Sequence, residues 1–127
     1  IDAGAEEGVG EGQFVYAFDM VLLGTVTKLE NHRATVQLFS APGRETVGSA
    51  EGSDLAITLI GRGAGEYEVR MPRDLEFAIG ELISYQSIES TVLARIEHIA
   101  TDPRDPFQRL YAKAPVNINA LKFVIVR

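Results

Sequence analysis

Alternation of apolar and polar residues is the feature that most restricts the fold of this chain. Ala34–Leu38 and Tyr67–Met71 alternate from residue to residue, and Leu55–Leu59 does so less strictly. Because successive side chains of a strand point to opposite faces, this period predicts strands with one buried face. No window of a dozen residues sustains a helical stripe, so little or no helix is expected.

Turn-forming residues separate the predicted strands. Glycine, proline and aspartate gather in Gly8–Gly12, Ala41–Gly43, Gly61–Gly65 and Asp102–Pro106. One capped helical turn is expected at Asn117–Leu121. The remaining strand candidates, most of them with β-branched or aromatic residues, are Gln13–Ala17, Val21–Leu29, Leu82–Tyr85, Val92–Ile99, Phe107–Ala114 and Leu121–Val126. About nine short strands with frequent turns predict an all-β chain of one or two small barrels, not a βαβ fold.

A weak internal repeat favours two related β units. Val9–Val15 lines up with Phe77–Ile83, since both place a glycine turn before an apolar strand. We therefore predict two small β-barrel subdomains packed in tandem. One is expected from residues 12–75, and the other from residues 1–11 together with 76–127.

Composition excludes several classes of function. The net charge of −6 disfavours a nucleic-acid partner, because binding to the phosphate backbone depends on lysine and arginine. The chain has no cysteine, which excludes disulfides, thiolate catalysis and cysteine-based zinc sites. It starts at Ile1 and has no apolar run of ~20 residues. We expect it to be a soluble fragment of a longer protein.

No motif predicts catalysis, a metal site or a cofactor. His32 is expected in a solvated turn and His98 in a partly buried strand position, and neither has a second ligand at a diagnostic spacing. Asp102 and Asp105 fit solvent-facing turn residues better than a calcium site. Gly61–Gly65 lacks the following helix and lysine of a phosphate loop, so a hairpin tip is expected. The chain is therefore predicted not to be an enzyme.

Aromatic residues and methionine mark one candidate surface. Phe14 and Tyr16 are expected to face a barrel interior, which places Phe18 and Met20 at its rim. The rim residues fit either the edge of the core or an apolar partner-binding patch, since aromatics and methionine are favoured in interface centres.

Several passages occur in the order found in a known family. They are Ile1–Val9, Gly24–Val26, Glu68–Asp74, Ile79–Ile83, Pro106–Ala114 and Leu121–Val126. Together they resemble the extracytoplasmic β region of the bacterial rod shape-determining protein MreC family. One departure is the Ser84–Thr91 loop, which replaces a glycine-rich stretch usual in the family.

The resemblance implies two six-stranded β-barrels outside the cytoplasmic membrane, anchored by an N-terminal segment absent from this chain. It implies a non-enzymatic scaffold of the cell-elongation machinery that serves peptidoglycan synthesis and cell shape. The implied partners are further copies of the chain, membrane partners such as MreD, and a class B penicillin-binding transpeptidase. The resemblance carries over no partner-contact residues, and those predicted from this sequence itself are Phe18, Met20 and Tyr85. The alternative is the β-barrel portion of a periplasmic adaptor, of the membrane-fusion type, in a transport system.

Overall fold

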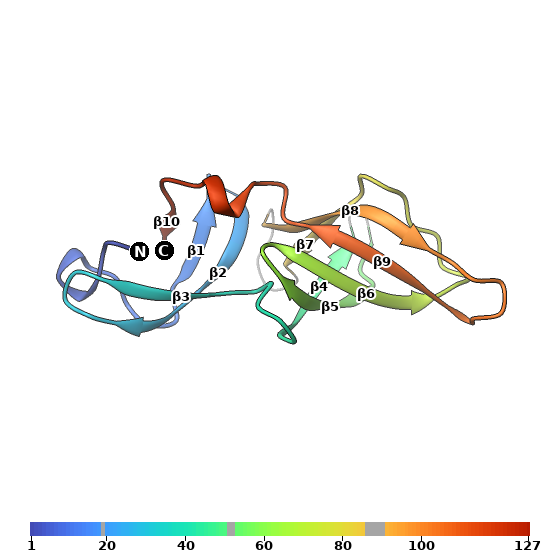
Figure 1. The fold of residues 1–127 in the computed structure, drawn as a ribbon, viewed down its shortest axis with the longest axis horizontal. Helices are drawn as coiled ribbons and strands as arrows, with labels where there is room; N and C mark the ends of the chain where they lie inside the picture. Colours follow the sequence, from blue (N-terminus) through green and yellow to red (C-terminus); the bar gives the residue numbers. More distant parts are fainter. Residues whose placement is uncertain (19, 51–52, 86–90) are drawn as a thin grey trace.

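The computed structural model describes residues 1–18, 20–50, 53–85 and 91–127, and nearly all of their regular structure is β-strand (Figure 1). The strands are β1 (Phe14–Ala17), β2 (Val21–Leu29), β3 (Ala34–Leu38), β4 (Glu45–Ala50), β5 (Ala56–Gly63), β6 (Glu66–Pro72), β7 (Leu82–Tyr85), β8 (Val92–Ala100), β9 (Phe107–Lys113) and β10 (Ile125–Val126). Two short 3-10 turns are η1 (Ala5–Glu7) and η2 (Ile118–Ala120). The expected all-β fold with little helix is confirmed.

Six of the strands close into a barrel. Its order is β4, β5, β6, β9, β8 and β7, and β7 pairs back with β4. Every neighbouring pair in this ring is antiparallel. Closure gives each strand two neighbours, which removes the exposed edges of an open sheet.

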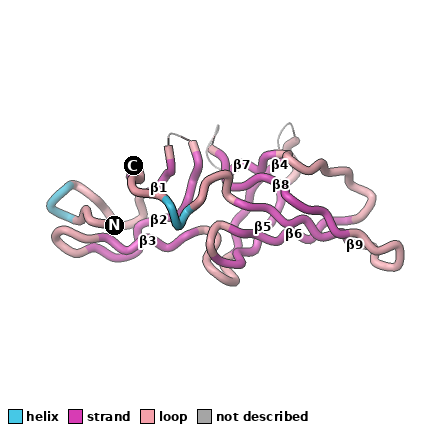
Figure 2. Tube along the Cα trace, turned by 45° about the horizontal axis from the view of Figure 1, so that its top comes forward, coloured by secondary structure: helices cyan, strands magenta, loops and turns pink. Residues whose placement is uncertain are grey.

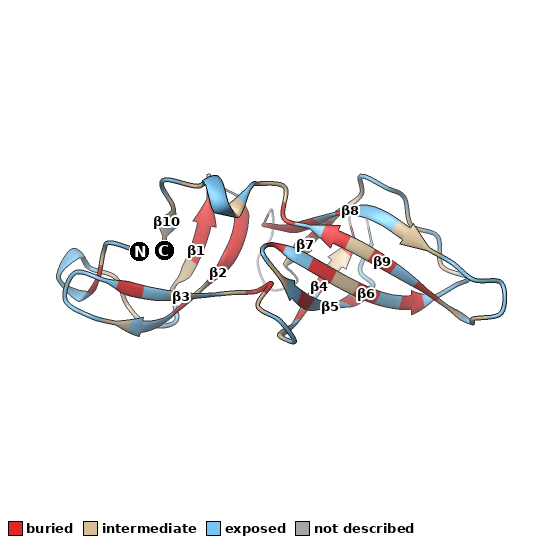
Figure 3. Ribbon diagram, in the orientation of Figure 1, coloured by how far each residue is buried: buried red, intermediate tan, exposed pale blue. Residues whose placement is uncertain are grey.

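The barrel interior is filled by side chains that alternate along its strands. Ile57 and Leu59 on β5, and Tyr67 and Val69 on β6, are at most 2% exposed (Figure 3). The residues between them face solvent or lie half-buried, as the period-two pattern predicts. Burial raises the pKa of the Tyr67 hydroxyl, because a phenolate is poorly solvated inside the barrel.

A smaller sheet lies beside the barrel along the long axis of the molecule (Figures 1 and 2). Its strands are β3, β2, β1 and β10, all antiparallel to their neighbours. One parallel bridge, Val21 with Val92, connects it to β8. On one face of this sheet Tyr16 and Leu22 join the core cluster of the barrel. On the other face Val15, Ala17, Val21 and Leu23 are covered largely by the C-terminal segment of the chain.

Strand pairing groups the chain differently from the expected subdomains. The barrel strands come from Glu45–Pro72 and Leu82–Lys113, and they therefore draw on both expected parts. The smaller sheet contains strands from near both ends of the chain, because β10 pairs with β1. The division into 12–75 and 1–11 plus 76–127 stays a prediction.

Most element positions follow the sequence pattern. The capped turn is confirmed, since the Asn117 carboxamide oxygen accepts a hydrogen bond from the Asn119 N–H at 3.2 Å. Only Ile125–Val126 of the expected Leu121–Val126 strand is paired. The hairpin tip between β5 and β6 is also confirmed, at Ala64 and Gly65. Residues 86–90 of the Ser84–Thr91 loop lie outside the described residues.

The expected burial of His98 is wrong. A β-bulge lies between Ile96 and His98 in the pairing of β8 with β9. A bulge inserts an extra residue and resets the alternation of side chains. His98 is therefore exposed, and its ring stacks on Tyr111 with the ring centroids 5.9 Å apart.

A buried hydroxyl in the barrel wall leads to a first prediction. Thr46 on β4 is 5% exposed, and its Oγ1 has no hydrogen-bond partner among the described residues. An unpaired buried hydroxyl costs roughly 1–3 kcal/mol, so Thr46→Val is expected to raise the free energy of unfolding by about 1 kcal/mol. Urea unfolding of the two proteins measures this difference.

The control is Thr58→Val, the same substitution at an exposed position of the neighbouring strand β5. It should change the free energy of unfolding by less than about 0.5 kcal/mol. Equal effects of the two substitutions would show that the Thr46 hydroxyl carries no burial cost.

Candidate partner-binding surface

An aromatic cluster fills the junction between the smaller sheet and the barrel. Phe14 from β1, Phe39 after β3 and Tyr85 from β7 pack with ring centroids 5.6–6.4 Å apart. The T-shaped contact of Phe14 with Tyr85 is a favoured arrangement of aromatic pairs. Phe39 is 4% exposed, and Tyr85 is half-buried. The structure therefore places Tyr85 in the junction cluster, whereas Phe18 and Met20 are exposed.

Arg44 connects the two parts through hydrogen bonds. It stands between the smaller sheet and β4, and its Nη1 donates to the carbonyl oxygens of Gln37 at 3.1 Å and Leu38 at 3.3 Å. Its Nη2 lies 3.4 Å from the hydroxyl of Thr25 on β2. The guanidinium also lies over the Phe39 ring, 4.4 Å from the centroid. A planar guanidinium supports several donors and a ring contact at once, which lysine does not.

The segment that links β3 to β4 is packed tightly against the barrel. The Ser40 hydroxyl is buried and accepts a hydrogen bond from the Gly65 N–H at 2.9 Å. A Cβ atom added at Gly61 would lie 2.2 Å from the Ala41 carbonyl oxygen, so this approach requires glycine. The link is therefore held in place by the barrel wall.

The junction gives a second prediction, in which Arg44→Met lowers the free energy of unfolding by about 1–2 kcal/mol. The loss combines charged hydrogen bonds to carbonyl groups with a cation–π contact at a partly exposed site. Thermal unfolding followed by circular dichroism measures it. Arg95→Met, at an exposed position on β8, is the matched control and should be close to neutral.

Phe18 occupies an unusual position in the turn between β1 and β2. Its backbone has φ of +55°, a conformation that costs a bulky residue roughly 1–3 kcal/mol. Its side chain is 69% exposed, and Met20 in the same turn is 49% exposed. Neither side chain is buried in the core, so burial does not offset the free-energy cost of the Phe18 backbone conformation. Backbone strain combined with an exposed aromatic ring is typical of a functional site.

The C-terminal segment adds two apolar side chains beside the turn between β1 and β2. Leu121, Val124 and Val126 pack on the smaller sheet. The extended backbone therefore directs Phe123 and Ile125 outward, where they are 87% and 37% exposed. A groove of about 400 Å³ separates this segment from Phe18, and its lining residues are Phe18 and Ala120–Ile125.

These residues form what we call the terminal apolar surface, namely Phe18, Met20, Phe123 and Ile125. The sequence predicted Phe18 and Met20 as partner contacts, and this stays a prediction. It did not predict the exposure of Phe123 and Ile125. Leu121–Val126 is apolar at nearly every position, so the sequence does not show which side chains face inward. An exposed cluster of large apolar residues on a folded protein is a candidate interaction surface.

The N-terminal segment is attached to the turn between β2 and β3 by contacts of His32 with two carboxylates. His32 contacts Glu6 through Nε2 at 3.0 Å and Glu7 through Nδ1 at 2.8 Å. The hydrogen bond from His32, followed by that from the Gly4 N–H, lowers the pKa of Glu7. His32 lies in an exposed turn, as expected from the sequence.

A third prediction concerns the titration of Glu7. Because the folded-state pKa is lowered, the stabilisation from this carboxylate is present above its ordinary pKa and is lost as the pH falls through the lowered value. In His32→Gln the pKa of Glu7 should rise toward 4.5, since the main cause of the shift is removed. Side-chain carboxyl NMR titration measures the pKa. His98→Gln, on the barrel, should leave it unchanged, and equal titration curves in all three proteins would contradict the pairing.

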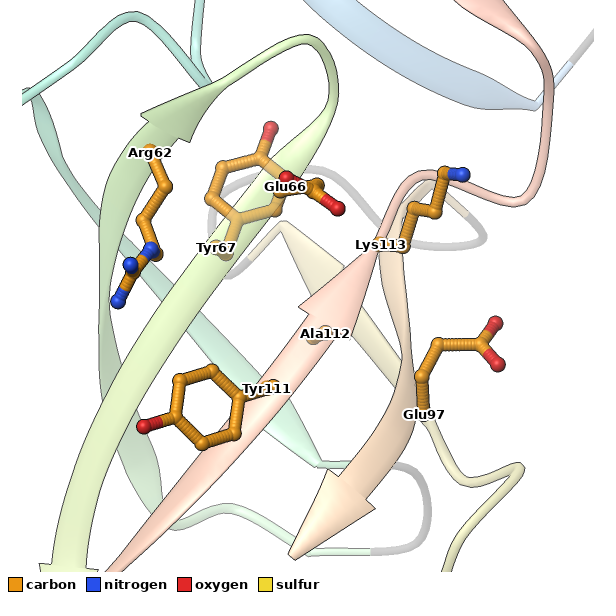
Figure 4. A pocket seen from close by; sticks show the side chains of 7 residues that line it. All are labelled: Arg62, Glu66, Tyr67, Glu97, Tyr111, Ala112 and Lys113. Carbon is orange, nitrogen blue, oxygen red and sulfur yellow. The ribbon is translucent and has the colours of Figure 1, made fainter.

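A polar depression of about 250 Å³ in the barrel wall is the alternative site (Figure 4). Arg62 there is engaged by Glu68, with Nη1 and Oε2 2.8 Å apart, and also lies near the Tyr111 ring. Lys113 and Glu97 line the opposite side. Mixed charges without a nucleophile beside a base do not form a catalytic arrangement.

Two further searches concern the described residues only. In residues 1–18, 20–50, 53–85 and 91–127, no three acidic or histidine side chains are grouped in a way that would hold a metal ion. The same residues contain no helix long and apolar enough to cross a membrane. Asp102 and Asp105 act as turn residues, since their carboxylates accept the N–H groups of Arg104 and Phe107.

Comparison with known proteins decides the family. The family described as "Rod shape-determining protein MreC, barrel core" matches residues 1–127, the whole chain. The chain belongs to the MreC family. Its resemblance at the level of sequence motifs is thereby confirmed, and membership supports a role in determining cell shape. The MreC family is one of structural, shape-determining proteins and not of enzymes.

Solved MreC structures share the fold. MreC from Pseudomonas aeruginosa superposes with a TM-score of 0.87 at 20% identity, covering 100% of this chain and 86% of that one. A structure described as MreC gives 0.86 at 21% identity, covering 99% and 75%. A third, the "major periplasmic domain from the cell shape-determining filament MreC", gives 0.59 at 14% identity, covering 91% and 75%. No curated protein sequence matched the chain.

Proposed function

We propose that this MreC-family chain is a non-enzymatic scaffold that acts by self-association and partner binding. The observation that carries the proposal is the terminal apolar surface, whose four large apolar side chains remain exposed on an otherwise well-packed molecule. Folding alone does not explain a strained, exposed phenylalanine, whereas burial in an interface does.

The proposed setting is the extracytoplasmic side of the cytoplasmic membrane, within the cell-elongation machinery for peptidoglycan synthesis. The periplasmic origin of a similar MreC domain supports this location. The proposed partners are further copies of the chain, membrane partners such as MreD, and a class B penicillin-binding transpeptidase. An anchor N-terminal to Ile1 belongs to the same proposal.

The mechanism is recruitment by burial of apolar surface. Fully burying a side chain such as phenylalanine or methionine stabilises a contact by roughly 1.5–3 kcal/mol. Phe18 and Met20 lie in the turn between β1 and β2, and Phe123 lies in the C-terminal segment. The surface therefore uses no barrel strand and leaves the barrel wall for a second contact. A scaffold needs at least two contact surfaces of this kind, since it holds partners together without altering them.

A fourth prediction tests this surface by sedimentation over a wide range of protein concentration. The unaltered chain is expected to associate as concentration rises. Combined Phe18→Glu and Met20→Glu should weaken that association by roughly 100-fold or more, since burying an unpaired charge costs several kcal/mol. Circular dichroism checks that the fold is kept.

The matched control is Ile79→Glu, which adds the same charge at another exposed apolar position, 66% exposed, in the loop between β6 and β7. It should leave association unchanged. Two outcomes would contradict self-association through the terminal apolar surface. One is a chain that stays monomeric at every concentration, and the other is equal association of the Phe18→Glu, Met20→Glu double variant and the Ile79→Glu variant.

A further inference from the structure

The outer face of β6, β9 and β8 places cations directly opposite cations. These strands are neighbours in the barrel wall (Figure 1). Arg70 on β6 is the register partner of Arg109 on β9, and we call this pair the arginine row. Lys113 on β9 is the register partner of Arg95 on β8, which we call the lysine row. All four residues are exposed. Like charges directly opposite each other destabilise a sheet, so folding alone does not account for the two rows.

The two guanidiniums of the arginine row turn away from each other. That of Arg70 lies over the Phe107 ring, 4.0 Å from the centroid. The Nε of Arg109 lies on the side of Glu68, 3.8 Å from its Oε1. Phe107 and Glu68 lie on opposite sides of the row along the strands. Repulsion between the two cations favours this divergence, and Glu68 is engaged more closely by Arg62, at 2.8 Å.

The lysine row has acidic neighbours but no ion pair with a described residue. Glu66 is the register partner of Lys113 on the side of β6. Glu66 and Glu97 line the same polar depression as Lys113 (Figure 4). Neither carboxylate forms an ion pair with Lys113 or Arg95 in the part of the chain that the structure describes. The arginine row, which has no acidic residue in register with it, is therefore the stronger anion site of the two.

The two rows match the spacing of an extended polypeptide. Arg109 and Lys113 are four residues apart on β9, a distance of about 14 Å at 3.4 Å per residue. Side chains on one face of an extended segment recur at every second residue, so carboxylates at positions i and i+4 would face the two rows. The side chain at i+2 would face the stacked rings of Tyr111 and His98. Two acidic residues with one apolar residue midway between them are therefore complementary to this face.

We propose that the outer face of β6, β9 and β8 binds an extended acidic segment of a partner protein, with one carboxylate at the arginine row and a second at the lysine row. This inference rests on the proposed function, in which the barrel wall is the second contact surface, and it specifies the chemistry of the partner. Bound carboxylates would offset the repulsion within each row, because arginine and lysine form charge-assisted hydrogen bonds with them.

A second copy of the chain fits this face less well. Closely spaced acidic residues of the chain are engaged within the chain itself. Glu6 and Glu7 contact His32. The carboxylates of Asp102 and Asp105 accept N–H groups of their own turn. Binding to the rows would require a second copy to give up these contacts.

The probe is a seven-residue peptide of threonine, with glutamate at positions two and six and valine at position four. Titration followed by NMR of the arginine Nε–Hε signals is expected to show saturable shifts of Arg70 and Arg109, with a Kd below about 10 mM. A peptide with glutamine in place of both glutamates should bind at least roughly fivefold more weakly. A third peptide, with its two glutamates adjacent, keeps the charge but loses the spacing. No saturable shift, or equal binding of the spaced and adjacent peptides, overturns the inference.

Substitutions on and off the face provide the matched comparison. Arg70→Gln removes one charge from the arginine row, and Arg104→Gln removes the same charge from the exposed turn between β8 and β9. Arg70→Gln should weaken peptide binding at least roughly threefold, whereas Arg104→Gln should leave it unchanged. Arg70→Lys, which keeps the charge, should bind more tightly than Arg70→Gln. Circular dichroism checks that all three variants are folded. Equal binding by Arg70→Gln and Arg104→Gln overturns the site.

Two further measurements identify the occupant. Sedimentation without peptide tests a second copy: self-association that is weakened by Arg70→Gln but not by Arg104→Gln overturns the partner segment. Polygalacturonate, a carboxylated polysaccharide, tests an anionic polymer, and binding equal to that of the peptide at the same carboxylate concentration also overturns it. Failure of the proposed function is distinguished from these results. It appears as unchanged sedimentation after Phe18→Glu and Met20→Glu, whichever way the Arg70 variants behave.

Discussion

The contact between the aromatic cluster and Arg44 fixes the orientation of the smaller sheet relative to the barrel. Phe14 lies in the smaller sheet, Phe39 follows its strand β3 directly, and Tyr85 lies in the barrel. Arg44 holds the link between them through carbonyl groups at the end of β3. Apart from this junction, the strand pairing of the two parts within the described residues is the bridge of Val21 with Val92. Because the junction is packed on both sides, the terminal apolar surface and the barrel wall keep one relative orientation. A rigid arrangement of two surfaces is what a scaffold requires.

Local patterns in the sequence predicted strands wherever the two faces of a strand differ in polarity. Val21–Leu29, Ala34–Leu38 and Leu82–Tyr85 were found with the observed bounds. Strand β4 was missed because its inward positions are Thr46, Gly48 and Ala50, whose small or polar side chains give no apolar alternation. Those small residues matter for the fold: a Cβ atom at Gly48 would lie 2.6 Å from the Ser84 carbonyl oxygen of the neighbouring strand. Barrel closure depends on such long-range approaches, and no local pattern records them.

The candidate site was predicted in part for similar reasons. Phe18 and Met20 stood out because they continue an alternating aromatic run past the point where it leaves the core. Phe123 and Ile125 were hidden, since their exposure depends on which face of an all-apolar segment packs on β1 and β2. The bulge at His98 was not predicted either. An extra residue changes the face on which each following side chain lies, but it leaves the composition of the strand the same.

The pairing of β10 with β1 has a mechanical consequence. The chain enters the smaller sheet, leaves it after β3 to form the whole barrel, and returns through η2 to β10. Tension applied between Ile1 and Arg127 is therefore carried first by the hydrogen bonds of the smaller sheet, including those of Phe14 with Arg127. The barrel lies outside this load path until β10 separates. A molecule built in this way yields first at its terminal sheet under a pull, while the six-stranded barrel keeps its shape.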